Sequence, residues 1–200
     1  MKYFTVIFIG ITSCSWGQRE IGGDWSDAIN LTIGNFWVYD MSIVQLPHNV
    51  RRTQPVDSVF IRKDSLLNGT QYFQLENLFG LSEWKKDSAG YLVNISGQLE
   101  FSTHFDKDTL WQNDDIIVFG GSELEDVKVP AGNFVSAVVV AIGKTPAGME
   151  IPKNSPVFFT EEFVITNKRW YVRGIGLVKS IDYYGTTTTF ERSLIRYNVR

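Results

Sequence analysis

The residues best suited to chemistry form an alternating polar row near the middle of the chain. The row consists of Glu100, Ser102, His104 and Asp106. Every second side chain of a β-strand points to the same face, so this row could bind a cation or act as acid and base. The same pattern is typical of the solvated outer face of an antiparallel sheet. We expect the solvated face, and an active site only if His104 lies in a deep pocket with Glu100 or Asp106.

Other patterns in the sequence give a weaker signal for catalysis or metal binding. His48 is the only other histidine, whereas zinc normally takes three or four protein ligands. The nucleophile motif G-x-S-x-G of hydrolases does not occur. Gly174-Ile175-Gly176 lacks the third spaced glycine of a dinucleotide-binding loop. We therefore expect no catalytic residue, no metal site and no cofactor.

Aromatic residues are the remaining candidates for a ligand site, since Phe, Trp and Tyr make up 14% of the chain. On the concave face of a curved sheet they could hold an acyl chain or another apolar small molecule. They could equally fill the core directly, as aromatic residues on strands usually do. The candidate cavity residues are Trp37, Tyr72, Trp84, Phe101, Trp111 and Trp170.

The elements that would position these residues follow the two-residue period of β-strands. Apolar residues alternate with polar ones from Trp37 to Ile43, and Asn68-Gly69 between two strand-like runs is a strong hairpin signal. We predict a mainly all-β fold of about ten antiparallel strands, because no helical stretch is long enough for a crossover. At most one short helix is expected, at Asp24–Ile29. Two proline-bearing segments, Gln45–Pro55 and Lys144–Pro156, are predicted to be long loops.

The first seventeen residues have the pattern of an export signal. Lys2 precedes an apolar run from Tyr3 to Ile11, and small residues follow it. The run is far shorter than the roughly 20 residues that cross a bilayer as a helix. We predict that residues 1–17 are a cleaved signal and that residues 18–200 form a single antiparallel β domain.

The only cysteine of the chain distinguishes two forms of cleavage. Ile11-Thr12-Ser13-Cys14 resembles a bacterial lipobox, in which cleavage before Cys14 leaves a lipidated cysteine at the amino terminus. Ordinary cleavage would instead leave Gln18 as the first residue. The apolar run ends just before Cys14, which favours lipidation. We therefore predict Cys14 as a lipid attachment site and a membrane as the partner of that lipid.

Net charge excludes one large class of partners. The chain carries a formal net charge of −3 and has no basic cluster. Because phosphate contacts need clustered lysine and arginine side chains, we expect no nucleic-acid partner.

Two motifs in the second half of the chain resemble a known group of proteins. Val129-Pro130-Ala131-Gly132-Asn133-Phe134 is followed by the segment Trp170–Lys179, W-Y-V-R-G-I-G-L-V-K. The pair resembles uncharacterised exported bacterial proteins that share V-P-A-G-x-F and W-Y-x-x-G-[IV]-G-L-V-K, and residues 34–39 look like their opening strand. The resemblance implies a curved antiparallel sheet, similar to the half-barrels of periplasmic lipoprotein carriers. It implies no established activity.

Together these observations predict an exported bacterial envelope protein, a lipoprotein, that acts as a non-catalytic binding module for an apolar ligand. It would lie in the periplasm or be anchored to the outer membrane, or else be secreted. One alternative is a secreted hydrolase-type enzyme with an unrecognised site. The other is an adhesion or assembly subunit, which an exposed apolar patch around Lys144–Pro156 would favour.

Overall fold

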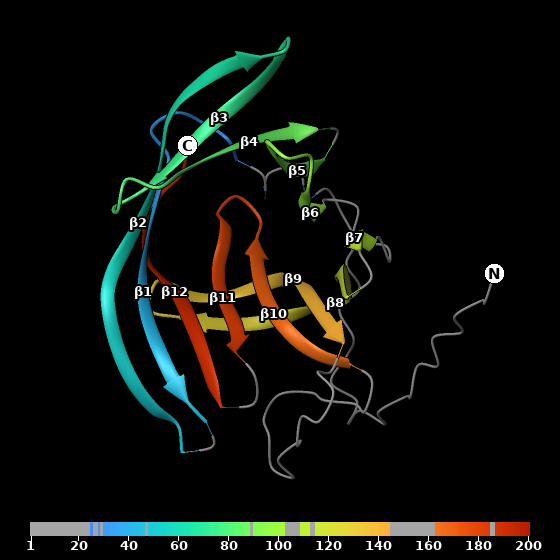
Figure 1. Ribbon diagram of the computed structural model, residues 1–200. Coiled ribbons are helices and arrows are strands. Elements are labelled where there is room, and N and C mark those ends of the chain that lie inside the picture. The colour runs from blue at the N-terminus through green and yellow to red at the C-terminus, as the bar shows by residue number, and fades with distance from the viewer. Residues whose placement is uncertain are drawn as a thin grey trace, which may run out of the picture.

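The computed structural model describes most of the chain after residue 24. The described residues are 25, 28, 30–46, 48–88, 90–102, 109–112, 115–144, 163–184 and 187–200. Their strands form one twelve-stranded antiparallel sheet in the order β6-β5-β4-β3-β2-β1-β12-β11-β10-β9-β8-β7 (Figure 1). The strands are β1 (Phe36–Gln45), β2 (Val50–Leu67), β3 (Thr70–Asn77), β4 (Ser82–Ser88), β5 (Tyr91–Asn94), β6 (Leu99–Ser102), β7 (Thr109–Gln112), β8 (Ile116–Val129), β9 (Gly132–Lys144), β10 (Phe163–Val172), β11 (Gly176–Tyr184) and β12 (Thr188–Asn198).

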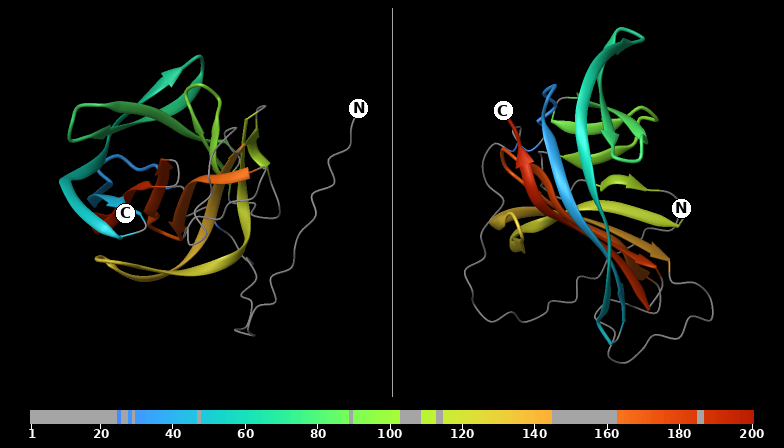
Figure 2. Two further views of the ribbon diagram at one scale, coloured as in Figure 1. Left: turned by 60° about the horizontal axis from the view of Figure 1, so that its bottom comes forward. Right: turned by 90° about the vertical axis from the view of Figure 1, so that its left-hand side faces the viewer.

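The sheet curls until it is almost a closed barrel. In Figure 2 the green strands β3–β6 face the yellow and orange strands β8–β10 across the interior. Pairing of β1 with β12 joins the two halves of the chain in the middle of the sheet. The edge strands β6 and β7 lie near each other, and the described residues show no pairing between them. The predicted curved antiparallel sheet is therefore confirmed, with twelve strands where about ten were expected.

The short helix expected at Asp24–Ile29 lies mostly outside the described residues. Within it, the backbone N–H of Ala28 donates to the carbonyl of Trp25 at 2.9 Å. No helix in the described part of the chain is long and apolar enough to cross a membrane.

The long loop predicted at Gln45–Pro55 is wrong, because much of this segment belongs to a strand that contains a break in register. Strand β2 begins at Val50 and runs through Pro55, so only residues 46–49 separate it from β1. Between the pairs Tyr39↔Asp57 and Met41↔Gln54, two residues of β2 oppose one residue of β1. Pro55 is one of these two. A proline is tolerated at such a bulge because no ladder donor is needed there, and the bulge increases the local twist.

The V-P-A-G-N-F motif forms the end of the β8–β9 hairpin, which crosses the outer side of β11 and β12 (Figures 1 and 2). The backbone N–H of Ala131 donates to the carbonyl of Leu194 in β12 at 3.0 Å. Val127 and Val129 belong to the same buried cluster as Trp170 and Val178. The two sequence motifs therefore meet in one core, and burial of these side chains holds the hairpin against the sheet.

The second motif also forms the turn between β10 and β11. Gly174 and Gly176 have φ values of +68° and +93°, a backbone region that glycine adopts far more readily than other residues. The side-chain N–H of Trp37 in β1 donates to the carbonyl of Ile175 at 2.6 Å. This bond fixes the turn to the first strand of the sheet.

Candidate ligand cavity

The concave side of the sheet encloses a cavity of about 430 Å³ that is partly open to solvent. Its walls come from nearly every part of the sheet, so the curvature of the barrel creates it. Hydrophobic side chains form one part of its lining: Trp37, Val59, Leu75, Leu81, Leu92, Leu99, Val118, Val139, Ala141 and Leu177.

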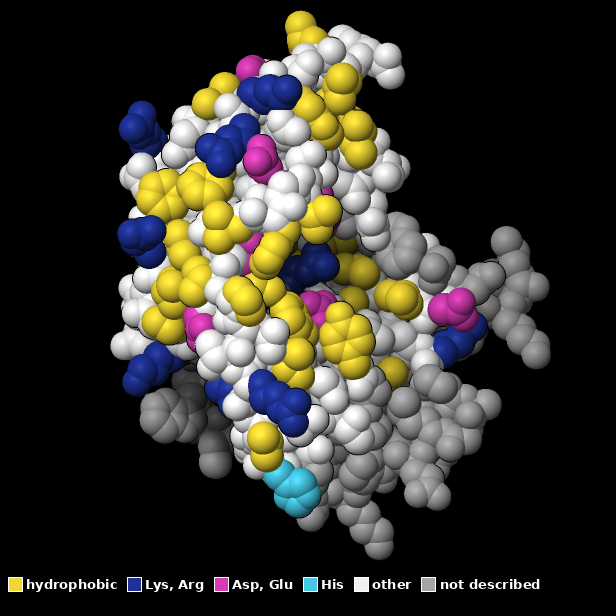
Figure 3. Space-filling view, turned by 60° about the vertical axis from the view of Figure 1, so that its left-hand side comes forward, with side chains coloured by type: hydrophobic (Ala, Val, Ile, Leu, Met, Phe, Trp, Pro, Cys, Tyr) yellow, Lys and Arg dark blue, Asp and Glu magenta, His cyan; other side chains and the backbone are white. Residues whose placement is uncertain are grey.

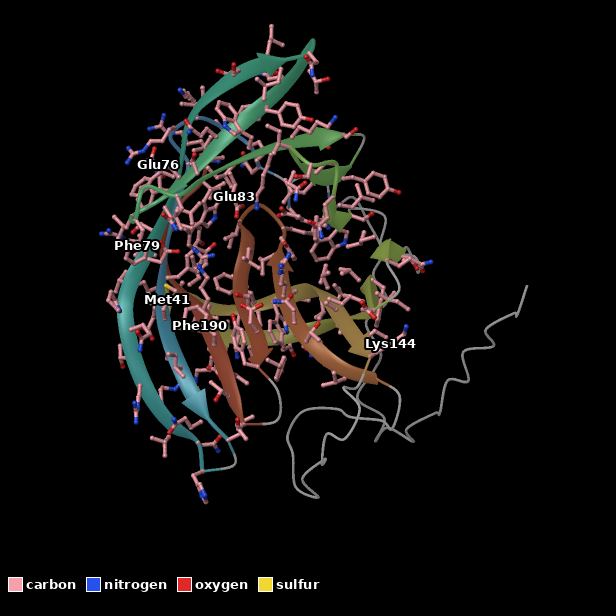
Figure 4. The ribbon with its side chains drawn as sticks, viewed as in Figure 1. Met41, Glu76, Phe79, Glu83, Lys144 and Phe190 are labelled. Carbon is pink, nitrogen blue, oxygen red and sulfur yellow. The ribbon has the colours of Figure 1, made fainter. Side chains whose placement is uncertain are left out.

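Charged side chains form another part of the lining. We call this group the interior charge cluster: Glu83, Lys85, Glu100, Arg169, Asp182 and Arg192. In Figure 4, Glu83 lies over the barrel interior, where it projects from β4. The cluster contains as many acidic as basic side chains, so it makes the cavity polar without giving it a strong net charge.

Lys85 lies at the centre of a three-residue ion network in this cluster. Its Nζ is 2.6 Å from Oε2 of Glu100 and 2.9 Å from Oε2 of Glu83. The side chains of Lys85 and Glu100 are only 13% and 16% exposed, whereas that of Glu83 is 68% exposed. The buried charge of Lys85 is therefore compensated mainly by Glu100, with Glu83 at the solvent side.

The electrostatics of the network favour its charged form. Burial is the largest single influence on Lys85 and lowers its pKa, but Glu100 and Glu83 together outweigh burial and raise that pKa overall. The Lys85 ammonium in turn lowers the pKa of Glu83. Lys85 therefore stabilises the fold below its ordinary pKa of 10.5, and this contribution is lost as the pH rises through the raised value.

A second charged pair lies in the barrel wall. The Arg192 guanidinium forms an ion pair with Asp57 and stacks over the ring of Tyr39, 4.3 Å from its centroid. Burial raises the pKa of Tyr39, so its hydroxyl stays protonated and donates to the carbonyl of Leu177 at 2.9 Å. Within the described part of the chain, Oδ1 of Asp57 and Nε of Arg192 are buried without a hydrogen-bond partner.

The structure does not bring the predicted cavity residues together. Trp37 lines the cavity. Phe101 is fully buried and packs on Tyr171, with ring centroids 4.2 Å apart. Trp170 is buried elsewhere, and its indole N–H donates to Oε2 of Glu125 at 3.0 Å. Neither Phe101 nor Trp170 lines this cavity. A contact of either residue with a ligand stays a prediction.

The other three aromatic candidates also lie apart from the cavity lining. The Lys86 ammonium lies 5.3 Å from the ring of Tyr72, and that of Lys63 lies 5.9 Å from the ring of Trp84. Trp111 belongs to β7, but its side chain is outside the described residues, and Cys14 lies outside them altogether.

We expected the polar row that contains Glu100 to lie on a solvated outer face. This prediction is wrong for the two residues of the row that the structure describes. Glu100 lines the cavity and Ser102 is buried. The ion pair with Lys85 explains how a carboxylate is accommodated inside the barrel. His104 and Asp106 lie outside the described residues. His48 is exposed in the β1–β2 turn, and the described residues contain no group of His, Cys, Asp and Glu that could hold a metal ion.

Sequence reasoning missed the interior charge cluster because it assigned charged side chains to the outer face. In β4, alternation predicts Trp84 inside with Glu83 and Lys85 outside, and the structure shows the reverse. A signal was present, since Lys86 places a charge on the same face as Trp84. Both faces of β4 therefore carry a charged side chain, and the sequence of this strand does not indicate which face turns toward an apolar core.

Two solved structures resemble this chain in part, at low sequence identity. No protein-family model and no curated protein matches the chain. A proposed exported protein of Bacteroides fragilis with a YmcC-like fold has a TM-score of 0.49 and 13% identity, covering 84% of this chain and 96% of that one. A proposed lipoprotein of Parabacteroides distasonis has a TM-score of 0.48 and 14% identity, covering 88% of this chain and 100% of that one.

Proposed function

We propose that this protein is an exported envelope protein that binds a small amphipathic molecule inside its half-barrel, as a non-catalytic binding module. The observation that supports this most is the cavity of about 430 Å³ on the concave side of the sheet. Small-molecule sites typically have volumes of roughly 300–1,000 Å³ and an apolar lining with a few polar groups. The cavity lies within this range of volumes, and its lining combines apolar side chains with the interior charge cluster.

Its lining favours a ligand with an apolar and a polar part over the purely apolar ligand that the aromatic content predicts. Trp37, Leu92 and Val139 offer apolar contact to an alkyl chain or a ring. A purely apolar ligand would also cover the interior charge cluster and give those side chains no hydrogen bonds in return, which is unfavourable. Because the cluster is balanced in charge, the polar end of the ligand is uncharged or zwitterionic.

Arg192 offers a contact for that polar end. It lines the cavity, and its buried Nε has no hydrogen-bond partner among the described residues. An ester, hydroxyl or phosphate oxygen of a ligand can accept this hydrogen bond. Such a bond would satisfy a buried donor, which raises affinity and fixes the orientation of the ligand.

A fluorescent acyl chain carried on three headgroups tests the proposal. The headgroups are a free carboxylate, a neutral glycerol ester and a zwitterionic phosphocholine. We expect the last two probes to bind with micromolar dissociation constants, equivalent to about −8 kcal/mol, and the carboxylate to bind more weakly. Trp37→Ala should weaken binding, because it removes apolar contact inside the cavity.

Trp84→Ala is the matched control, because it removes the same side chain from outside the cavity lining. A second variant, Leu92→Trp, should block binding in a folded protein by filling the cavity. The proposal would be abandoned if no probe binds the folded wild type, or if both tryptophan variants reduce binding equally.

Export and lipid attachment are part of this proposal and rest on the signal-like residues 1–17 and the lipobox-like Cys14. A relationship to exported proteins with the V-P-A-G-x-F and W-Y-x-x-G-[IV]-G-L-V-K motifs is also part of the proposal, and it rests on these two sequence motifs. We expect the mature protein to begin at an acylated Cys14, and Cys14→Ser to block this route of maturation. Mass spectrometry of the mature amino terminus decides the matter, and an unmodified chain that begins at Gln18 would contradict lipid attachment.

A further inference from the structure

The turn between β3 and β4 exposes three large hydrophobic side chains. We call them the apolar turn: Leu78, Phe79 and Leu81, which are 58%, 62% and 68% exposed. Figure 4 shows Phe79 at the outer edge of the barrel, beside β2. Single exposed hydrophobic residues are common on protein surfaces, but a cluster at a protruding turn indicates an interaction site.

Hydrogen bonds to the side chain and the backbone of Asn77 hold this turn in a fixed shape. Oδ1 of Asn77 accepts hydrogen bonds from the backbone N–H groups of Phe79 and Leu81, both at 3.0 Å. The N–H of Asn77 donates to the carbonyl of Leu81 at 2.9 Å, and Gly80 takes a φ of +74°. The apolar turn is thus preorganised, and little conformational entropy is lost when it inserts into a partner.

Cations and aromatic rings extend from this turn across the neighbouring strands. We call them the cation–aromatic band: Arg62, Phe60, Phe36 and Arg196. The Arg62 guanidinium lies 4.6 Å from the centroid of Phe60, the two rings are 5.8 Å apart, and Arg196 lies 5.8 Å from Phe36. Arg62 also approaches Glu76, which precedes the turn, to 3.7 Å. Figure 3 shows hydrophobic side chains on this side of the molecule with Lys and Arg side chains along its edge.

We propose that the apolar turn and the cation–aromatic band dock on the surface of an anionic lipid bilayer. Exposed apolar side chains beside arginines match the two layers of a bilayer surface, hydrocarbon below and anionic headgroups above. A protruding turn of three side chains fits insertion into lipid better than a protein interface, which needs about 800 Å² from each partner. The proposal does not depend on the cavity binding a ligand, although Leu81 also lines the cavity.

An environment-sensitive label on the turn tests this directly. In a Cys14→Ser background, which leaves the chain without cysteine, Phe79→Cys carries a nitrobenzoxadiazole label. We expect its emission to shift to the blue with vesicles of phosphatidylcholine and phosphatidylglycerol, and much less with phosphatidylcholine alone. Because the label reports its own surroundings, binding through other segments gives no signal at this position. Leu66→Cys is the matched control, an exposed leucine in the β2–β3 hairpin.

Variants without a label, in the same Cys14→Ser background and so without a lipid anchor, give the second measurement. Leu78→Ser/Phe79→Ser should lower the vesicle partition coefficient at least about tenfold, because two apolar side chains no longer enter the bilayer. Arg62→Gln/Arg196→Gln should remove most of the dependence on phosphatidylglycerol and on salt, whereas Leu66→Ser should change neither. Equal emission shifts at positions 79 and 66, or no shift at either, would overturn the proposal. So would unchanged partitioning of the double serine variant, whatever the cavity probes show.

Discussion

Replacing Lys85 with methionine is expected to lower the free energy of unfolding by about 3 kcal/mol. The variant leaves the mostly buried carboxylate of Glu100 without its partner at 2.6 Å. The free-energy cost of leaving Glu100 charged and unpaired in the barrel wall is far larger than the free energy lost with the exposed ion pair between Lys85 and Glu83. Denaturant unfolding of the wild type and the variant at neutral pH measures the difference.

A double variant distinguishes the lost ion pair from lost packing. Lys85→Met/Glu100→Leu removes both charges, so it should recover most of the stability that Lys85→Met loses. Lys63→Met, at an exposed position in β2, should change stability by less than about 0.5 kcal/mol. If the single and double variants are equally destabilised, burial of Glu100 is not the cause.

Phe101→Ala is expected to destabilise the protein by about 3–5 kcal/mol, the usual cost of removing a large ring from a packed core. Phe101 is fully buried in a cluster with Tyr171 of β10, Val139 of β9 and Leu110 of β7. It therefore ties the edge strand β6 to strands from the other half of the barrel. Thermal and denaturant unfolding should both report the loss.

Phe79→Ala is the control for this prediction, because the same side chain is removed from an exposed turn. It should change stability by no more than about 0.5 kcal/mol. Similar losses in the two variants would show that the contacts of Phe101 do not hold the two halves of the barrel together.

Local features of the fold were predictable from the sequence because they depend on neighbouring residues. Asn68 and Gly69 both take positive φ values, of 51° and 76°, as a tight hairpin turn requires. Gly90 likewise accepts positive φ in the turn after Asp87, whose Oδ1 accepts the N–H of Gly90 at 2.9 Å. The all-β class followed from such signals and from the two-residue period of the strands.

The site was harder to predict because it depends on which face of each strand turns inward. A bulge shifts the alternation by one residue, and the sequence alone does not mark it, as Pro55 illustrates. The polar cavity also breaks the rule that charged side chains point outward, so Glu100 was expected on the wrong side and the role of Lys85 was missed. Closure of the barrel adds a third difficulty, because the pairing of β1 with β12 joins residues far apart in the sequence.

The pairing of β1 with β12 also sets an order in which the barrel can be assembled. Apart from the pairing of β1 with β12, strands β1 to β6 pair with their sequence neighbours, as do β7 to β12, so each half can form from short-range contacts. The seam between the halves requires residues 188–198, which form the last of the twelve described strands. A ribosome or a translocation channel that releases the chain from its amino terminus therefore delivers the first half well before the seam can close. Until then β1 is an unpaired edge, open to strands of other chains.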